Sequence, residues 1–353
     1  MNKQDTGSKK QKNVNNKPVE NTTYAYEYGG WKYRQIDSPR MFEIIPDKKI
    51  PKPSTFFKYY CLNDYNVDAL KNHYVYASHP NQLNDVYDAS DFLVPIDNPY
   101  KARRVFRECY DDASMVCQGD ERLFYLKATE LFQMLAFKNT GIVSLTDSNA
   151  NMVLWGSYTN HEGFCVEFDV SFIDGKSIDP FPMNYVKELE HIDWAPNMSS
   201  LLCTLVMSSV KQECWSHEHE WRLLLSYPNQ REFMPLFDYS GDEDKSYEAR
   251  RDRKFYYYPE AIKSITLGRK FFHKKEILKY KSETSIDLFI GDLNKKVLLD
   301  CIVQMQENVS QHVVPIYQFN PFSKPLPHSA VPMPIRINKM GPNRYNITEL
   351  SQN

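Results

Sequence analysis

The stretch VSLTDSNANMVLWGSYTNHEGFCVEF, residues 143–168, indicates the fold more clearly than any other part of the chain. It continues a strand-like run at residues 142–145 and then passes into turn-forming and helix-capping residues at 147–151. Residues 152–158 predict a short helix with an aromatic face, and residues 164–168 predict a second strand. This pattern fits one wall of a cleft, carrying Trp155, Tyr158 and His161. An ordinary connection with buried aromatic residues is the alternative.

The composition is that of an ordinary folded protein. The 353 residues are 42% hydrophobic and 25% charged, and the formal net charge is −2, as in soluble globular proteins. No overall basic field indicates binding to nucleic acid or a membrane. No run approaches the ~18 apolar residues that a membrane-spanning helix needs. The seven cysteines include no Cys-x-x-Cys pair, so we expect reduced thiols, no zinc ribbon and a cytoplasmic location.

The order of strand-like and helix-like segments predicts one α+β domain at residues 31–325. We expect a mixed, mostly antiparallel sheet, split around a cleft and flanked by helices. Residues 1–30 are expected to form a disordered polar leader, because their first 25 residues contain almost no apolar side chains. The proline-containing residues 326–353 are expected to form an extended C-terminal tail. We also expect a helix near residues 273–282.

Charged side chains enter an apolar strand at residues 215–225. A period of two would place Glu218, Glu220 and Arg222 on one face, opposite the histidines at 217 and 219. Burying these charges costs several kcal/mol unless they pair with one another or bind a polar ligand. A structural Glu–Arg ion pair and a ligand site both fit this pattern. The two histidines have no obvious acidic or thiol partner, so no metal site is expected.

Two earlier segments carry polar residues toward the same predicted sheet. Residues 55–60 alternate as a strand and carry Lys58. Residues 74–78 form a second strand and lead into a polar loop that contains Asn84 and Asp85. These side chains can brace the loop through their own hydrogen bonds, or they can contribute to a site.

Several of these segments, in this order, resemble one bacterial family, which is catalogued as domain of unknown function 2971. The resemblance covers roughly residues 55–320. The sequence departs from the family pattern at residues 86–87, where Pro-Phe is usual, and at Leu154, where methionine is common. The matching pieces are FKY at 57–59, YASHP at 76–80, LND at 83–85, Asp88, WGSY at 155–158, HEGFCVEF at 161–168, Trp215, EHEWR at 218–222, Ile262, Ile265 and Leu267-Gly268.

The order of elements in that family is similar to that of mono-ADP-ribosyltransferases, which cleave NAD and pass ADP-ribose to a target. The resemblance therefore implies an ADP-ribosyltransferase-like fold with NAD as substrate and no metal. Carried onto this sequence, it implies that Lys58, Tyr158, Glu220 and His161 are the catalytic residues. In that chemistry Glu220 would stabilise the positive charge that develops on the ribose.

The same resemblance implies a set of residues that contact NAD. An aromatic ring of Tyr158 or Trp155 would stack on nicotinamide, and Lys58 or Arg222 would pair with the pyrophosphate. The expected partners are NAD or a related nucleotide and a macromolecular acceptor, with no membrane. A toxin or antiphage effector would suit such chemistry. The expected NAD-contacting residues are Trp155, Asn84, Arg222, Ser78 and Glu218.

Two other functions remain open from the sequence. A metal-independent ribonuclease would use His161 or His217 as general acid–base, with Arg222 and Lys58 on the phosphate. A non-catalytic module that senses a nucleotide or a partner would bind its ligand without turnover. Such a module would tolerate the substitution Glu220→Gln.

Overall fold

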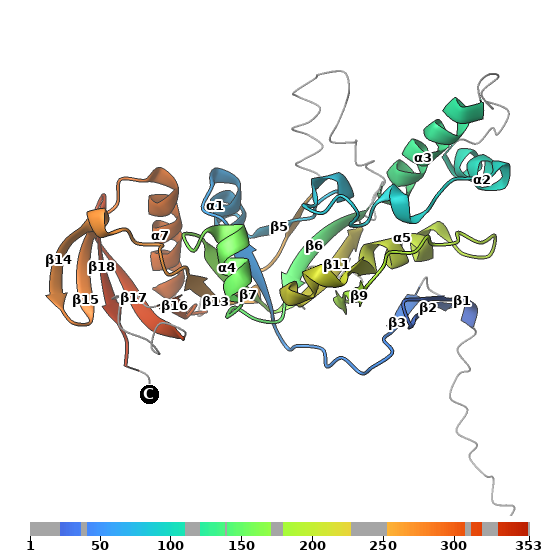
Figure 1. The fold of residues 1–353 in the computed structure, drawn as a ribbon. Coiled ribbons are helices and arrows are strands. Elements are labelled where there is room, and N and C mark those ends of the chain that lie inside the picture. The colour runs from blue at the N-terminus through green and yellow to red at the C-terminus, as the bar shows by residue number, and fades with distance from the viewer. Residues whose placement is uncertain are drawn as a thin grey trace, which may run out of the picture.

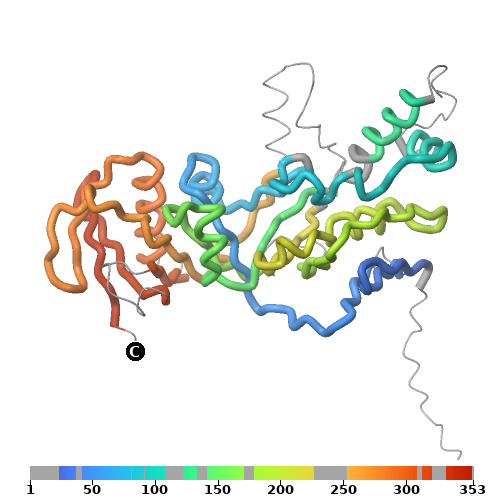
Figure 2. The backbone as a smooth tube through the Cα atoms, in the orientation of Figure 1, coloured from blue at the N-terminus to red at the C-terminus, as the bar shows by residue number. Residues whose placement is uncertain are grey.

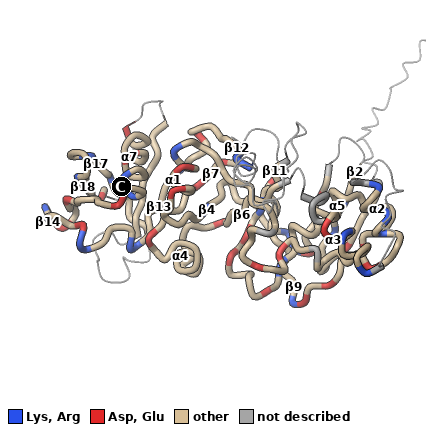
Figure 3. The backbone as a smooth tube through the Cα atoms, turned by 90° about the horizontal axis from the view of Figure 1, so that it is seen from above, with Lys and Arg blue, Asp and Glu red and all other residues tan. Residues whose placement is uncertain are grey.

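A computed structural model describes residues 22–36, 41–109, 121–137, 140–170, 179–226, 253–307, 312–319 and 331–351. The protein is a mixed α+β structure with one large, mostly antiparallel sheet and several helices. Figure 1 shows the sheet running along the molecule, with its C-terminal strands at one end and α2, α3 and α5 near the other. Basic and acidic residues are interspersed along the whole backbone (Figure 3), as the small net charge suggests.

The large sheet has eleven strands, and β13 and β16 are its only parallel neighbours among the described residues. In spatial order the strands are β14 (Ile277–Ser282), β15 (Ser285–Phe289), β18 (Arg344–Glu349), β17 (Pro332–Gly341), β16 (Ile316–Phe319), β13 (Ile262–Leu267), β7 (Phe164–Phe168), β4 (Phe56–Tyr60), β6 (Thr140–Thr146), β11 (Glu220–Ser226) and β8 (Phe181–Pro182).

The sheet is weakly joined at one place, between β4 and β6. These strands share a single residue pair, Phe57 with Thr146. By contrast, β4 pairs with β7 along its whole length, and β11 pairs with β6 throughout residues 220–226. We call the β4–β6 junction the seam. The sequence predicted a split sheet, but the strands on both sides of the seam belong to one hydrogen-bonded sheet.

Two hydrophobic cores lie on opposite faces of β6 and β11. Because side chains alternate along a strand, Val143 and Leu223 enter one core. Their neighbours Ile142 and Leu224 enter the other core, which also contains side chains of α5 (Ser200–Ser209). Arg222 shares a face with Leu224, so a charged group lies directly beside the second core.

Helix α4 (Met152–Thr159) confirms the short helix predicted at residues 152–158. The Asn151 side chain caps its first turn by accepting from the backbone N–H groups of Val153 and Leu154. Asn160 closes its last turn in the left-handed conformation, with φ of 51°, as C-terminal caps commonly do. The predicted strand at 164–168 is β7.

The remaining elements are further helices and three small sheets. The described part of the chain contains no helix that is long and apolar enough to cross a membrane. The other helices are α1 (Asp64–Lys71), α2 (Pro99–Cys109), α3 (Glu121–Phe137) and α7 (Leu293–Gln306). The small sheets are β1 (Thr22–Tyr28) with β2 (Trp31–Ile36) and β3 (Met41–Ile45), β9 (Asn184–Val186) with β10 (Val210–Gln212), and β5 (Tyr74–Tyr76) with β12 (Lys254–Tyr256).

The predicted boundaries need three corrections. The expected tail at 326–353 is wrong, because β17 and β18 lie within the large sheet and contribute Ile337 and Ile347 to a core. Figure 2 shows this red segment beside the orange strands. The predicted helix near residues 273–282 is mostly β14. The expected disordered leader at 1–30 is wrong from β1 onward, and residues 1–21 lie outside the described residues.

Candidate functional site

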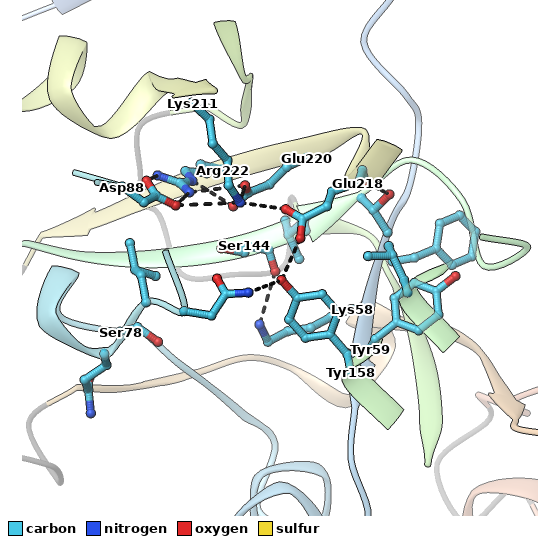
Figure 4. A pocket seen from close by; sticks show the side chains of 17 residues that line it. Lys58, Tyr59, Ser78, Asp88, Ser144, Tyr158, Lys211, Glu218, Glu220 and Arg222 are labelled. Carbon is cyan, nitrogen blue, oxygen red and sulfur yellow. Dashed lines mark hydrogen bonds and ion pairs between the residues drawn. The ribbon is translucent and has the colours of Figure 1, made fainter. Parts of the chain in front are cut away.

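A cavity of about 240 Å³ opens beside the seam, and we call it the seam cavity. It lies where β4 and β6 separate, with α4 on one side and the loop after β5 on another. Its polar lining comes from six separate parts of the chain (Figure 4). Among these lining residues are Lys58, Ser78, Asn84, Asp88, Ser144, Tyr158, Lys211, Glu218, Glu220 and Arg222.

Arg222 lies at the centre of a buried ion cluster. Its side chain is fully buried and donates to both carboxylate oxygens of Asp88 and, through Nε, to Oε1 of Glu220 at 2.7 Å. It also donates to the carbonyl oxygen of Ser208 at 2.9 Å. Burial alone would lower the pKa of Arg222, but Asp88 and Glu220 raise it well above its ordinary value. The guanidinium is therefore charged at every accessible pH.

Lys211 joins the cluster to a second glutamate. Its Nζ donates to Glu218 at 2.6 Å and to Glu220 at 3.0 Å, and it lies 3.7 Å from Asp88. Burial alone would lower its pKa, but Glu220 and Asp88 raise it. Burial would also raise the pKa of Glu220, but Arg222 and Lys211 lower it to about 2. Glu220 is thus an ionised carboxylate at neutral pH.

A chain of hydrogen bonds crosses the cavity from the second glutamate. The Tyr158 hydroxyl donates to Oε1 of Glu218 at 2.7 Å and accepts from the Asn84 amide at 3.0 Å. Burial and the hydrogen bond to Glu218 raise the pKa of Tyr158 far above its usual range, so the hydroxyl remains protonated. Helix α4 and the loop after β5 are therefore connected through groups that are partly open to solvent.

Lys58 is the cation of this site that is not used in an ion pair with any residue the structure describes. Its Nζ donates to the carbonyl oxygen of Ser144 across the seam at 3.1 Å. Burial lowers its pKa from 10.5 to about 8, although Glu220 opposes this shift. At neutral pH Lys58 is therefore mainly protonated and can pair with an anion in the cavity.

The two glutamates meet through a turn rather than along one strand. The sequence predicted a period of two through residues 217–222, but Glu218 ends a 3-10 helix, η4 (Glu213–Glu218). His219 follows in the left-handed conformation with φ of 47°, and β11 begins at Glu220. The Thr146 hydroxyl donates a hydrogen bond to the carbonyl oxygen of Glu218 at 2.9 Å. The prediction that Glu218, Glu220 and Arg222 gather on one side is correct, but its geometric reason was incomplete.

The structure brings together seven of the nine predicted site residues. Lys58, Ser78, Asn84, Tyr158, Glu218, Glu220 and Arg222 all line the seam cavity.

Trp155 and His161 do not belong to this group, which corrects the prediction. They line a different cavity of about 400 Å³, which we call the His161 cavity. On a helix, residues 154 and 158 share one face while 155 lies about 100° away. The Trp155 ring is buried edge-on against Tyr59 at 5.0 Å, so it cannot stack on a ligand in the seam cavity.

Sequence reasoning missed two charged members of the cluster, Asp88 and Lys211. A buried arginine and two buried glutamates require partners of opposite charge, so such partners could have been sought. Nothing local identifies them, since Asp88 is 134 residues away from Arg222. Lys211 lies in β10, directly after the apolar helix α5, and lysines are usually found at the surface.

Neither histidine of the predicted ribonuclease lines the seam cavity, in which Arg222 and Lys58 lie. His217 is exposed in η4, and His161 lies in the other cavity. Within the residues described, no group of three His, Cys, Asp or Glu side chains could hold a metal ion.

The chain was compared with models of protein families, with curated proteins and with solved structures. None of the three comparisons found a match. The resemblance to domain of unknown function 2971 therefore stays a prediction from the motifs.

Proposed function

We propose that the seam cavity binds NAD and breaks its nicotinamide–ribose bond, passing ADP-ribose to water or to a macromolecular acceptor. One observation carries the proposal. Two glutamates, Glu218 and Glu220, are bridged by Lys211 on the wall of a cavity that also holds Lys58 and Tyr158. The proposal includes an ADP-ribosyltransferase-like fold and membership of the family named domain of unknown function 2971.

The chemistry requires a fixed negative charge beside the ribose. As the bond between C1′ and the ring nitrogen breaks, its electron pair goes to nicotinamide and positive charge develops on the ribose. An ionised carboxylate held in a cavity stabilises that charge without reorganising. The attacking oxygen of water or acceptor then bonds to C1′ and releases its proton to the solvent. Glu220 is suited to the electrostatic role because its neighbours keep its pKa near 2.

The two glutamates differ in what a substrate can reach. Both oxygens of Glu220 already accept from Arg222 or Lys211, so this carboxylate is fixed in place. Oε1 of Glu218 instead accepts from the neutral Tyr158 hydroxyl. A ribose hydroxyl can replace that donor at similar cost. We therefore assign Glu218 to the ribose hydroxyl and Glu220 to the charge at C1′.

The size of the cavity and its unpaired cation suggest how NAD would lie. At about 240 Å³ the cavity is smaller than the ~300–1,000 Å³ of sites that enclose a whole drug-sized ligand. It therefore accommodates one end of the dinucleotide, which we take to be the nicotinamide riboside. Lys58 is then placed to pair with the pyrophosphate.

A second candidate function is a nucleotide-sensing module without turnover. It is favoured by the balance of the site, in which three cations face three carboxylates: Lys58, Lys211 and Arg222 against Asp88, Glu218 and Glu220. Such a neutral network can hold a ligand and stabilise the fold without performing chemistry. It predicts NAD binding that survives the substitution Glu220→Gln.

The deciding experiment is nicotinamide release from NAD by the full-length protein and by Glu220→Gln. We expect the variant to lose at least about tenfold in rate, which corresponds to ~1.4 kcal/mol of transition-state stabilisation. Glu218→Gln should lose activity with a raised KM, because it removes a contact to the ribose.

The matched control is Glu213→Gln, an exposed carboxylate on the same short helix as Glu218. It removes the same charge and should retain full activity. NAD binding without nicotinamide release, unchanged in Glu220→Gln, would replace catalysis by the sensing function. An absence of both binding and release would remove NAD from the proposal.

A further inference from the structure

The His161 cavity lies against a different face of α4 from the seam cavity. Leu154 and Tyr158 face the seam cavity, whereas Met152 and Trp155 face the His161 cavity. The proposed NAD chemistry uses none of its lining residues. A ligand of this second cavity would therefore be distinct from the NAD of the seam cavity.

The rim of the His161 cavity carries basic side chains, and no acidic side chain of the described lining balances their charge. Arg269 and Lys270 lie beside His161, and no carboxylate belongs to the lining that the structure describes. Neither Arg269 nor Lys270 forms an ion pair with any described residue, unlike the cations of the seam cavity. Three nitrogen-bearing side chains therefore converge on one opening without an internal counter-charge.

Backbone hydrogen bonds between two loops hold these basic side chains close to one another. The N–H of Lys270 donates to the carbonyl oxygen of His161 at 2.8 Å, and the N–H of Gly268 donates to that of Gly163 at 2.9 Å. A Cβ at Gly268 would lie 2.3 Å from the His161 carbonyl oxygen, so only glycine allows this approach. The basic side chains are thus held together by fixed loops.

His161 itself has an uncommon backbone conformation. Its φ is 60°, directly after the left-handed Asn160. Asn160 caps α4, which accounts for its own conformation. The conformation of His161 turns its imidazole toward Gly156, and a Cβ at Gly156 would lie 3.7 Å from Nε2. Strained residues of this kind gather where a side chain must be aimed at a ligand.

The floor of the cavity is aromatic. Trp155 and Phe319 are buried and meet edge-to-face, with their ring centroids 5.5 Å apart. Met152 is exposed at its edge and can adapt to a flat apolar group. A ligand for this cavity therefore needs an anionic end for the rim and an apolar body for the floor.

We propose that the His161 cavity binds an organic phosphate with a flat apolar body, such as a nucleoside monophosphate. The guanidinium of Arg269 offers paired donors that match two phosphate oxygens, and the Lys270 ammonium adds a point charge. The base would rest against Met152, the exposed apolar side chain of the cavity, above the buried rings of Trp155 and Phe319. The site is independent of the seam cavity and does not rest on NAD cleavage.

The test uses AMP, adenosine and inorganic phosphate as probes, with the full-length protein, in calorimetry at low ionic strength. AMP should bind with a Kd below about 1 mM and more tightly than inorganic phosphate, while adenosine should not bind measurably. The double variant Arg269→Gln/Lys270→Gln should bind AMP at least about tenfold more weakly, because it loses charge-assisted hydrogen bonds. His161→Asn, which tolerates the left-handed backbone, should also bind more weakly while remaining folded.

Two controls separate this site from the alternatives. Lys48→Gln/Lys49→Gln removes the same charge from another exposed adjacent pair and should leave AMP affinity within about twofold. Lys58→Met, in the seam cavity, should do the same. If AMP fails to bind, if Lys58→Met abolishes binding, or if both double variants weaken it equally, the proposal is wrong.

A magnetic resonance titration of His161 gives an independent readout. Burial and the neighbouring charges of Lys270 and Arg269 hold the pKa of His161 below its ordinary value. A phosphate bound among these groups would offset their field and raise that pKa. An unchanged His161 pKa in the presence of saturating AMP would place the nucleotide elsewhere.

Discussion

At the scale of single residues, Arg222 stabilises two buried carboxylates at once. Removing one partner of a buried ion pair leaves uncompensated charge and costs about 3–5 kcal/mol. We expect Arg222→Leu to lower the free energy of unfolding by about this amount, because both Asp88 and Glu220 lose their counter-charge. Urea unfolding of the two proteins measures the difference.

Arg336 provides the comparison, since it is an exposed arginine on strand β17. Arg336→Leu should change the free energy of unfolding by less than ~0.5 kcal/mol. A loss below about 1 kcal/mol for Arg222→Leu would show that the cluster contributes little to stability and is present for another reason.

For Lys58 we expect the opposite change in stability, because its substitution should raise the free energy of unfolding. Its pKa falls from 10.5 to about 8 in the folded protein, so below pH 8 the folded protein holds a partly desolvated ammonium at a cost in stability. Between pH 8 and 10.5 the unfolded chain binds more protons, and stability must rise with pH. We expect Lys58→Met to be more stable than the wild type at pH 7, with the advantage shrinking as pH passes through this window.

Urea unfolding of both proteins at pH 7 and pH 10.5 isolates the Lys58 contribution, because the tyrosines titrate equally in both. A stability difference that stays constant with pH would mean that Lys58 is well solvated. Lys58 would then not be a cation whose burial lowers the stability of the fold.

At the scale of secondary-structure elements, the sequence predicted correctly those elements whose conformation depends on residues close by in the chain. The caps of α4 and the apolar runs of β4 and β7 were correctly interpreted, because Asn151 and the alternating side chains act within a few residues. Strand β14 was mistaken for a helix, because its lysines and tyrosine are mostly exposed and show no clear period of two. Its partner β15 decides its conformation.

The turn between α4 and β7 yields a prediction at this scale. A Cβ at Gly163 would lie 2.1 Å from the carbonyl oxygen of Tyr60 on β4. Gly163→Ala must therefore push the turn away from the sheet, and we expect a loss of about 1–3 kcal/mol in thermal or urea unfolding.

Gly291→Ala is the matched variant, because its Cβ would meet only Phe289 at an ordinary 3.9 Å. It should be close to neutral. Equal stability of the two alanine variants would mean that the turn moves freely, and that α4 does not depend on β4 for its position.

At the scale of the whole molecule, the candidate site was predictable only in part. Glu218, Glu220 and Arg222 were found because buried charges stand out in an apolar segment. Asp88 and Lys211 were missed because their pairing depends on long-range topology. The C-terminal strands were missed because Pro332 and Pro334 in β17 resemble loop residues, while the alternation at Ile335 and Ile337 is short.

The seam also differs from the other strand junctions in the contacts that hold it together. Backbone pairing between β4 and β6 is limited to Phe57 and Thr146, with one lysine–carbonyl contact beside it, whereas the β4–β7 and β6–β11 pairings are continuous. Side-chain packing nevertheless continues across the seam, because one hydrophobic core contains residues of both β4 and β11, and the ring centroids of Phe56 and Trp221 lie 5.4 Å apart. A ligand in the cavity that contacts Lys58 on β4 and Glu220 on β11 would therefore add polar contacts where backbone hydrogen bonds between the strands are few.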